Sequence, residues 1–297
     1  MGGDLPHVCH RLPAEAVSGA PQRAAAAPPL LAFRAWQPTA FGAVNWRGLW
    51  ALYYGYGVSR FLRFGLETLA GPLVSSLLFL LVFVVGQRDL GEMLPGVGLT
   101  EFIAPGIVLY AVAYTAFQNS AAMIVMDKME GTIADVQMAP LSPLEVMAGF
   151  ALSAATCGLA SGSLVAIGTA LFVDYSYFDA TLVLGFAVAT ALLFALLGTI
   201  AGLWAERWDH YGAVEGFVIV PLGLLSGTFF SVVRLPEVFR DWIYFNPVLY
   251  AVDGFRAGFI GQAETSLVLG GTLLAALNLI LALLAWRLFT AGYKIRP

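Results

Sequence analysis

The sequence has little charge, few histidines and almost no cysteine. Only 11% of its 297 residues are Asp, Glu, Lys or Arg, whereas soluble globular domains carry about 25%. The two cysteines, Cys9 and Cys157, indicate neither a disulfide framework nor a cysteine-based metal site. The three histidines form no ligand cluster with carboxylates. We therefore expect this chain to bind no metal and no cofactor of its own.

A nucleotide-binding motif is also missing. No G-x-x-x-x-G-K-[ST] loop occurs anywhere in the chain, and this is the loop that cradles phosphates in P-loop ATPases. Any process that this chain drives with ATP therefore needs a second protein that binds and hydrolyses the nucleotide.

Ionisable residues are expected only near the ends of the apolar segments. One polar group, expected at a turn between two spans, comprises Glu206, Arg207, Asp209, His210 and Glu215. It is typical of a solvated turn, with a proton relay through His210 as the alternative interpretation. An ion-coupled carrier normally needs a charged or broken-helix site at mid-membrane, so the pattern disfavours that function. No nucleophile–base pattern indicates a membrane enzyme, and we expect no catalytic residues.

What the chain has in abundance is apolar sequence. Hydrophobic residues make up 59% of it, its mean hydropathy is +0.80, and several stretches reach the ~20 residues that cross a bilayer. We predict an all-α integral membrane protein with six transmembrane helices. The expected spans are residues 68–86, 102–125, 146–173, 180–204, 212–231 and 267–289.

The distribution of basic residues predicts the orientation. Six spans put both termini on one side of the membrane, and with the termini in the cytoplasm 11 of the 15 Lys and Arg residues face inward. This asymmetry follows the positive-inside rule. We therefore expect both termini to be cytoplasmic.

Two different segments precede the first span. Residues 1–44 are rich in Ala, Pro and Gly and cannot bury much apolar area, so we expect a disordered tail. They lack the basic start and apolar core of a signal peptide. Residues 45–66 combine tryptophans and tyrosines with three arginines. That mixture favours an amphipathic helix lying in the headgroup layer.

Residues 126–150 are a long polar interruption that is neither a tight turn nor an obvious loop. Ile133–Met138 is a short amphipathic run between a Gly break and a Pro break, which predicts a helix lying along the membrane surface. An ordinary linker is the alternative. Ser142 is expected to cap the next helix, with a capping box. The candidate coupling residues are Asp127, Lys128, Glu130, Gly131, Thr132, Pro140, Ser142, Pro143 and Glu145.

A second polar region, residues 232–260, is too polar for a simple span but rich in aromatic residues. Pro236 is expected to open one short helix, and Pro247 a second helix capped by Asn246. Such a pair, which includes Tyr250, fits a re-entrant element between spans five and six. Asp253 and Arg256 are three residues apart on the second helix, a spacing at which they could form a pair. The alternative interpretation is that both charges reach the outer membrane interface.

Glycines recur four residues apart, a spacing that lets helices approach closely in lipid. The pairs are Gly158 and Gly162, Gly198 and Gly202, Gly212 and Gly216, and Gly223 and Gly227. Because glycine is common in membrane helices, each pair alone is a weak signal. The third expected span is rich in Ala, Gly and Ser throughout, which predicts a helix packed on several sides.

Two stretches resemble a known family. EGTIADVQMAPLSPLEVMAG (130–149) is similar to the segment after the second span in permease subunits of ABC-2 type exporters. PLGLLSGTFFSVVRLPEVFRDWIYFNPVLYAVDGFRAGFIG (221–261) resembles the family's Pro-Leu…Asn-Pro-x-x-Tyr…Asp-x-x-Arg pattern. The resemblance covers roughly residues 45–297. One departure is that residues 55–57 lack the acidic partner of an Arg-Glu pair that the family often carries there.

The resemblance implies a function and partners. It implies a six-span permease domain over 67–297 in a bacterial inner membrane, with a cytoplasmic coupling helix between spans two and three. A separate ABC ATPase subunit would bind ATP and contact that helix, and two permease copies would form a homodimer in membrane lipid, without nucleic acid. The substrate leaving the cytoplasm would be hydrophobic, amphipathic or glycan-type. An ion-coupled multi-pass secondary transporter is the alternative.

Overall fold

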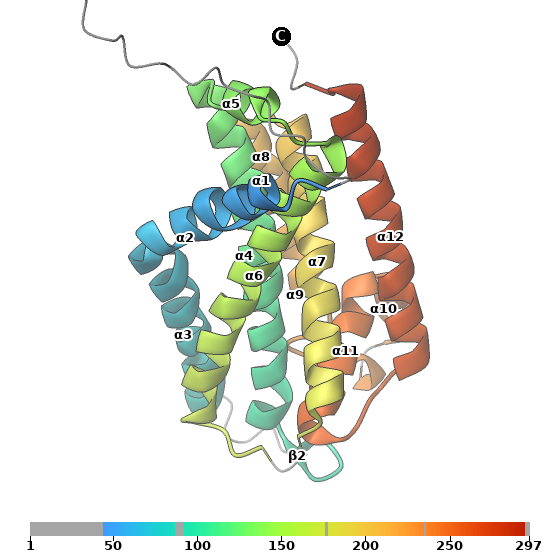
Figure 1. The fold of residues 1–297 in the computed structure, drawn as a ribbon. Coiled ribbons are helices and arrows are strands. Elements are labelled where there is room, and N and C mark those ends of the chain that lie inside the picture. Colours follow the sequence, from blue (N-terminus) through green and yellow to red (C-terminus); the bar gives the residue numbers. More distant parts are fainter. Residues whose placement is uncertain (1–43, 87–91, 176–177, 235, 295–297) are drawn as a thin grey trace, which may run out of the picture. The chain divides into compact units, whose positions relative to one another are not determined.

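The computed structural model describes residues 44–86, 92–175, 178–234 and 236–294. The tail expected to be disordered, residues 1–44, lies outside the described residues except for Val44. The described chain is a bundle of helices with one antiparallel pair of short strands (Figure 1). Its first elements are α1 (Trp46–Trp50), η1 (Ala51–Val58), α2 (Ser59–Arg63), η2 (Leu66–Ala70), α3 (Gly71–Gly86), β1 (Glu92–Leu94) and β2 (Val97–Gly98).

The rest of the chain is helical. The elements that follow β2 are α4 (Leu99–Glu130), α5 (Ile133–Met138), α6 (Pro143–Ala170), α7 (Ala180–Trp204), α8 (Trp208–Val214), η3 (Glu215–Ile219), α9 (Val220–Leu224), η4 (Val232–Arg234), α10 (Glu237–Tyr244), α11 (Pro247–Ile260) and α12 (Leu267–Ala291). The segments η1, η2 and η3 are π-helical turns, and η4 is a 3₁₀ turn.

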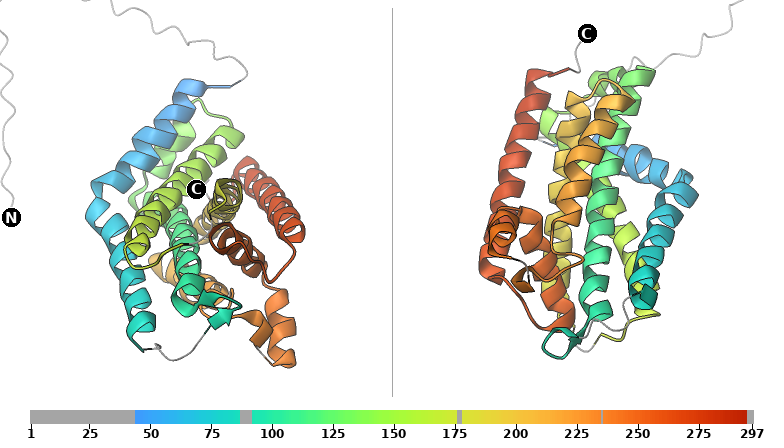
Figure 2. Two further views of the ribbon diagram at one scale, coloured as in Figure 1. Left: turned by 90° about the horizontal axis from the view of Figure 1, so that it is seen from below. Right: turned by 180° about the vertical axis from the view of Figure 1, so that it is seen from behind.

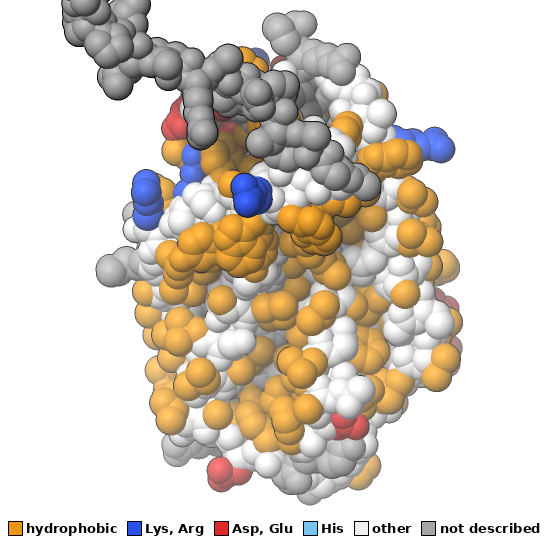
Figure 3. Space-filling model, in the orientation of Figure 1, with side chains coloured by type: hydrophobic (Ala, Val, Ile, Leu, Met, Phe, Trp, Pro, Cys, Tyr) orange, Lys and Arg blue, Asp and Glu red, His pale blue; other side chains and the backbone are white. Residues whose placement is uncertain are grey.

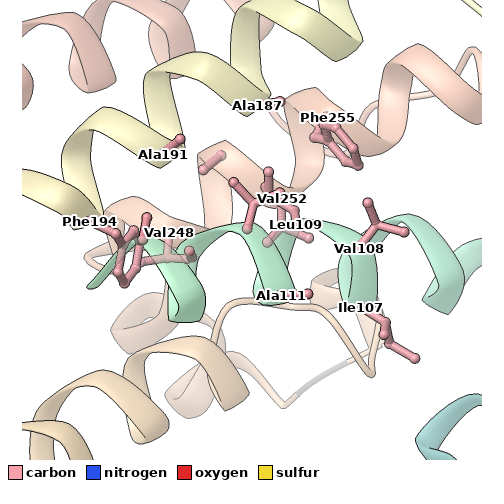
Figure 4. Close-up of a cluster of buried hydrophobic side chains, with 14 of the residues drawn as sticks. Ile107, Val108, Leu109, Ala111, Ala187, Ala191, Phe194, Val248, Val252 and Phe255 are labelled. Atoms are coloured by element: carbon pink, nitrogen blue, oxygen red, sulfur yellow. The ribbon is translucent and has the colours of Figure 1, made fainter. Parts of the chain in front are cut away.

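Helix α4 is the centre of the bundle. It packs against α7, α6, α3 and α11, and 78% of its most apolar stretch is buried, against 11% for the peripheral α12. Side chains from α4, α7 and α11 meet in a dense apolar cluster (Figure 4). Because lipid is as apolar as these side chains, close packing rather than transfer out of water holds such helices together.

Close approach depends on glycines at two crossings. A Cβ at Gly198 of α7 would overlap the Phe117 carbonyl of α4, and one at Gly158 of α6 would overlap the Val112 carbonyl. The crossings also carry the hydroxyl pairs Ser120–Thr199 at 2.7 Å and Thr115–Ser161 at 3.1 Å. Two of the four glycine pairs expected from spacing, Gly198 with Gly202 and Gly158 with Gly162, therefore lie at helix contacts.

The other two glycine pairs serve different purposes. At Gly212 and Gly216, no heavy atom lies within 4 Å of the point that a Cβ would occupy. Gly223 contacts the ring of Tyr110, and Gly227 has a φ of +73°, a left-handed turn conformation that favours glycine. Within the described part of this chain, Gly212 and Gly216 therefore lie at no helix crossing, and Gly227 lies in a turn.

Within the part of the chain that the structure describes, four helices are long and apolar enough to cross a membrane: α4, α6, α7 and α12. A fifth span results if Trp46–Arg63 and Thr68–Phe83, which meet at 81°, form one bent span. The six-span arrangement therefore remains a prediction. The expected span 212–231 is helical only to Leu224, because Gly223, Ser226 and Gly227 turn the chain there.

The two short helices expected within 232–260 are present. Pro236 precedes α10, and Asn246 caps α11 with Pro247 in its first turn. The Asn246 side chain accepts from Val248 N at 3.0 Å and donates to the carbonyls of Leu222 and Leu225, which end α9. One amide thus satisfies backbone groups at two helix ends, which apolar surroundings require. The pair lies away from the end that carries α5 (Figure 1).

Gly198→Ala tests the α4–α7 crossing. The added methyl group meets a backbone carbonyl, so the helices must separate, at a cost of about 1–3 kcal/mol, and we expect a lower melting temperature in detergent. Gly185→Ala on the same helix is the matched control, because nothing lies within 4 Å of its Cβ position and alanine favours helix by about 1 kcal/mol. Equal melting temperatures for the two variants would contradict the close packing.

Candidate functional site

The helix between α4 and α6 is built from local signals. Gly131 ends α4 with a φ of +76°, and the six residues of α5 follow. Ala139 is extended, and Ser142 then caps α6, with Pro143 in its first turn. The Ser142 Oγ accepts from Glu145 N at 3.3 Å, and Glu145 Oε2 accepts from Ser142 N at 2.6 Å. The capping box expected from the sequence is therefore present.

Glu145 also binds the start of the segment formed by α1, η1 and α2, which is called the amphipathic segment below. Its Oε1 accepts from Asn45 N at 2.5 Å, and the Asn45 side chain donates to the Pro140 carbonyl at 3.2 Å. The same Asn45 side chain accepts from Gly48 N and so caps α1. The loop between α5 and α6 and the beginning of α1 are thus one hydrogen-bonded unit.

A second tie joins the other end of the amphipathic segment to α4. Arg60 of α2 forms an ion pair of 3.0 Å with Asp127, whose side chain is fully buried, and Thr132 donates to the same oxygen. The Arg60 guanidinium also lies over the Tyr56 ring. The acidic partner missing from residues 55–57 is therefore supplied from outside the segment, by the last turn of α4.

Lys128 points toward the end of α7. Its ammonium group donates to the carbonyls of Gly202, Leu203 and Ala205, which no longer have helical partners at that helix end. Asp127 and Lys128 therefore bind other parts of the same chain and do not belong to an exposed surface.

The other predicted coupling residues divide by exposure. Glu145 is buried and Thr132 is half-buried, whereas Glu130, Gly131, Pro140, Ser142 and Pro143 are exposed. Three apolar side chains are exposed beside them, Met129, Met138 and Leu144. A groove of about 260 Å³ adjoins this surface. Its walls come from α5, the start of α6 and the end of α12, and include Ile133, Val136, Phe150 and Phe289.

Lys294, shortly after α12, contacts the polar turn that follows α7. Lys294 pairs with Glu206 at 2.8 Å and donates to the Trp204 carbonyl at 3.1 Å. The hydrogen bond between Lys294 and Glu206 lowers the pKa of Glu206 and raises the pKa of Lys294. Both groups are exposed to solvent. The Trp204 and His210 rings are also in contact, as expected for a solvated turn.

A cleft runs along α4 between α3 and the segment formed by α8, η3 and α9, which flank α4 in the right-hand view of Figure 2. It contains two cavities of about 420 and 430 Å³, and Gln118 lines both. The α4 residues in the cleft recur at three- and four-residue steps, so they form one face of the helix. They are Ile107, Tyr110, Ala111, Tyr114, Thr115, Gln118, Asn119, Ala122, Met123 and Met126.

Glu215 is a site residue that the sequence analysis misplaced. It lies in η3, and its carboxylate accepts a hydrogen bond from Tyr114. Tyr114 is in the middle of α4 (Leu99–Glu130), so Glu215 does not belong to the turn with Glu206. Its helix begins at Trp208, four residues before the expected span, which moves Glu215 about 6 Å further along the helix axis. The aromatic start of the helix at Trp208 is the signal that would have placed it.

The expected pairing of Asp253 with Arg256 is wrong. Asp253 accepts from the backbone N–H groups of Glu264 and Thr265 and from the Thr265 hydroxyl. The alternative, that both charges reach the interface, is also wrong for Arg256, which is 1% exposed. Long-range contacts determine both side chains, because α11 is buried among α4, α7 and α12.

Arg256 binds parts of the chain remote in sequence. It donates to the carbonyls of Phe102 at 3.1 Å and Gly227 at 2.6 Å, and its guanidinium lies 3.6 Å from the centre of the Phe102 ring. The hydroxyl of Tyr250 donates to the Tyr244 carbonyl at 3.2 Å. Arg256 and Tyr250 therefore bind α10 and α11 to other parts of the same chain and to each other.

Comparison with known proteins identifies the family. Residues 43–260 match the family model of the ABC-2 type transporter. An inner membrane transport permease of Escherichia coli strain K12, YadH, is 30% identical over 241 residues, covering 80% of this chain and 93% of that protein. Nodulation protein J of Rhizobium leguminosarum bv. viciae is 26% identical over 224 residues, covering 74% of this chain and 84% of that protein.

These matches confirm the resemblance that the two sequence stretches carry. Together with the long apolar helices, they support a location in a bacterial inner membrane. Transport permeases of this kind are generally not enzymes themselves. The chain therefore belongs to the ABC-2 type transporter family, as a membrane transport permease.

Proposed function

We propose that this chain is the membrane-spanning subunit of an exporter that is driven by a separate ABC ATPase. The observation that carries the proposal is the surface around α5, where Met129, Met138 and Leu144 are exposed beside the groove on α5, α6 and α12. A partner protein that buries these side chains would contact a surface of defined position. The Gly131 turn precedes α5, and the capping box at Ser142 follows it.

The α5 end of the bundle is the cytoplasmic end in this proposal. Lys and Arg side chains lie toward that end of the face shown in Figure 3, below which the surface is mainly hydrophobic. This distribution agrees with the positive-inside rule. The amphipathic segment α1–η1–α2 then lies at the inner interface, and α10 and α11 form a re-entrant element on the outer side.

The cleft along α4 is the proposed transport path. One cavity includes Arg60 and Trp208, and the other, farther from α5 along α4, includes Phe79 and Phe229. Both cavities fall within the roughly 300–1,000 Å³ typical of ligand sites. A homodimer with the two clefts facing each other would enclose a path that one copy leaves open. A hydrophobic, amphipathic or glycan-type substrate suits this mixture of aromatic, amide and hydroxyl side chains.

The ties at Asn45 and Arg60 would transmit motion from the ATPase. Movement of α5 displaces the Pro140–Glu145 loop and the last turn of α4, and both are bonded to the amphipathic segment. The segment continues into α3, one wall of the cleft. ATP binding and hydrolysis in the partner would thus bias two arrangements of the path.

Met138→Glu tests the docking surface without disturbing the contacts of Asp127 and Lys128. Met138 is 76% exposed, and a charge at an interface centre costs about 2 kcal/mol, roughly thirtyfold in Kd. We expect a P-loop ATPase to co-purify with the detergent-solubilised wild-type chain and to be lost from the variant. Leu171→Glu, 80% exposed at the other end of α6, should retain it. If the ATPase stays bound to the Met138 variant, α5 is not the docking surface.

Glu145→Gln tests the mechanical tie. Glutamine has one acceptor oxygen where the carboxylate uses two, so one backbone N–H of Asn45 or Ser142 loses its partner, at about 1–3 kcal/mol. We expect faster deuterium exchange at residues 45–50, while the ATPase still co-purifies. Glu130→Gln is the matched control, because Glu130 is exposed. Unchanged exchange at residues 45–50 in the Glu145 variant would refute the tie.

A further inference from the structure

Glu215 is a half-buried carboxyl residue level with the middle of α4. Its carboxylate is bonded to Tyr114, 15 residues from the start and 16 from the end of α4. Ion pairs among the described residues are Arg60–Asp127 and Lys294–Glu206, and neither includes Glu215. Ionisable residues within membrane-spanning helices generally mark function.

Three tyrosines of the cleft lie near the Glu215 carboxylate, which itself lines neither cavity and is bonded to Tyr114. Tyr110 and Tyr114 are stacked with ring centres 5.9 Å apart, and both line the deeper cavity. Tyr211 lines the other cavity, and its ring stacks on Phe117. Faces of tyrosine rings attract cations, most strongly where water is excluded.

Two buried polar atoms in the same cleft have no hydrogen-bond partner within the described residues. They are the Tyr211 hydroxyl and the Asn119 Oδ1 atom, and both residues line the cavity of about 420 Å³. The Tyr211 residue is 7% exposed. Buried polar atoms without partners are rare, and a ligand would satisfy them.

The backbone at Glu215 is also unusual. Glu215 begins the π-helical turn η3, between Gly212 and Gly216, neither of which has a neighbouring atom at its Cβ position. Single π-helical turns are frequent at functional sites. Here the turn places the carboxylate against α4, while the glycines leave space beside it.

We propose that Glu215, with Tyr110, Tyr114 and Tyr211, forms a recognition site for an organic cation in the cleft. The transported substrate would be an amphipathic molecule that carries an ammonium or similar positive group on an apolar body. The Glu215 carboxylate binds the positive group of the substrate, and the tyrosine rings contact the edges of that group. The apolar body of the substrate occupies the cavities. This inference rests on the proposed transport function of the same cleft, and narrows its substrate class.

The test uses two probes of equal shape and opposite charge, radiolabelled tetraphenylphosphonium and tetraphenylborate, with the purified chain in lipid nanodiscs. We expect the cation to bind at least about tenfold more tightly than the anion, a difference of roughly 1.4 kcal/mol. Glu215→Gln should weaken cation binding about tenfold and leave or improve anion binding, which shows that the variant is folded. Glu215→Asp should retain most of the affinity for the cation.

Glu237→Gln is the matched control, because Glu237 is exposed on α10, away from the cleft. It should leave cation binding unchanged. Equal affinity of the wild-type chain for both probes, or full cation affinity in Glu215→Gln, would overturn the proposal. If Glu215→Gln yields no folded protein, the cation selectivity of the wild-type chain decides alone. Probe binding is measured without an ATPase. A negative result here therefore leaves the proposed ATPase partnership untouched, and loss of ATPase co-purification leaves the cation site untouched.

Discussion

The last turn of α4 is the point on which the rest of the structure depends. Asp127 holds Arg60 of the amphipathic segment, and the adjacent Lys128 holds the carbonyls that end α7. Polar groups at helix ends must find partners where water is scarce. Two neighbouring charges of opposite sign therefore join the central helix to elements on two sides, and α5 follows immediately. A force applied to α5 would reach α4, α7 and the amphipathic segment through these few strong contacts.

Buried charged side chains that bind other parts of the chain help this apolar protein to keep its helices in a defined arrangement. Arg256 joins α11 to α4 and to the Gly227 turn, and Asp253 fixes the loop that leads into α12. Neither charge is available to a partner. Glu215 differs from both, since it is bonded to Tyr114 of the cleft and forms no ion pair among the described residues. The contrast separates charges that fasten helices from the one that we propose to meet substrate.

Sequence reasoning was successful where the signal is local. The capping box at Ser142, the break at Gly131 and the cap at Asn246 each depend on residues within a few positions, and all three are present. It failed where partners are remote: Tyr114 and Glu215 are 101 residues apart, and Arg256 reaches Phe102 across 154. The fifth expected span was misplaced because hydropathy does not show that α8 starts at Trp208 or that the chain turns after Leu224. Asp127 and Lys128, which were expected on the coupling surface, turn inward because Arg60 and the carbonyls that end α7 bind them there.

The most direct test of the coupling account is photo-crosslinking in intact cells, from one exposed position at each end of the chain. A crosslinking amino acid at Met138, on α5, is compared with one at Phe245, which is 85% exposed between α10 and α11. The account predicts a covalent adduct with a P-loop ATPase from position 138 and none from position 245. An adduct from position 245 alone, or from neither position while ATP-driven export continues, would contradict it.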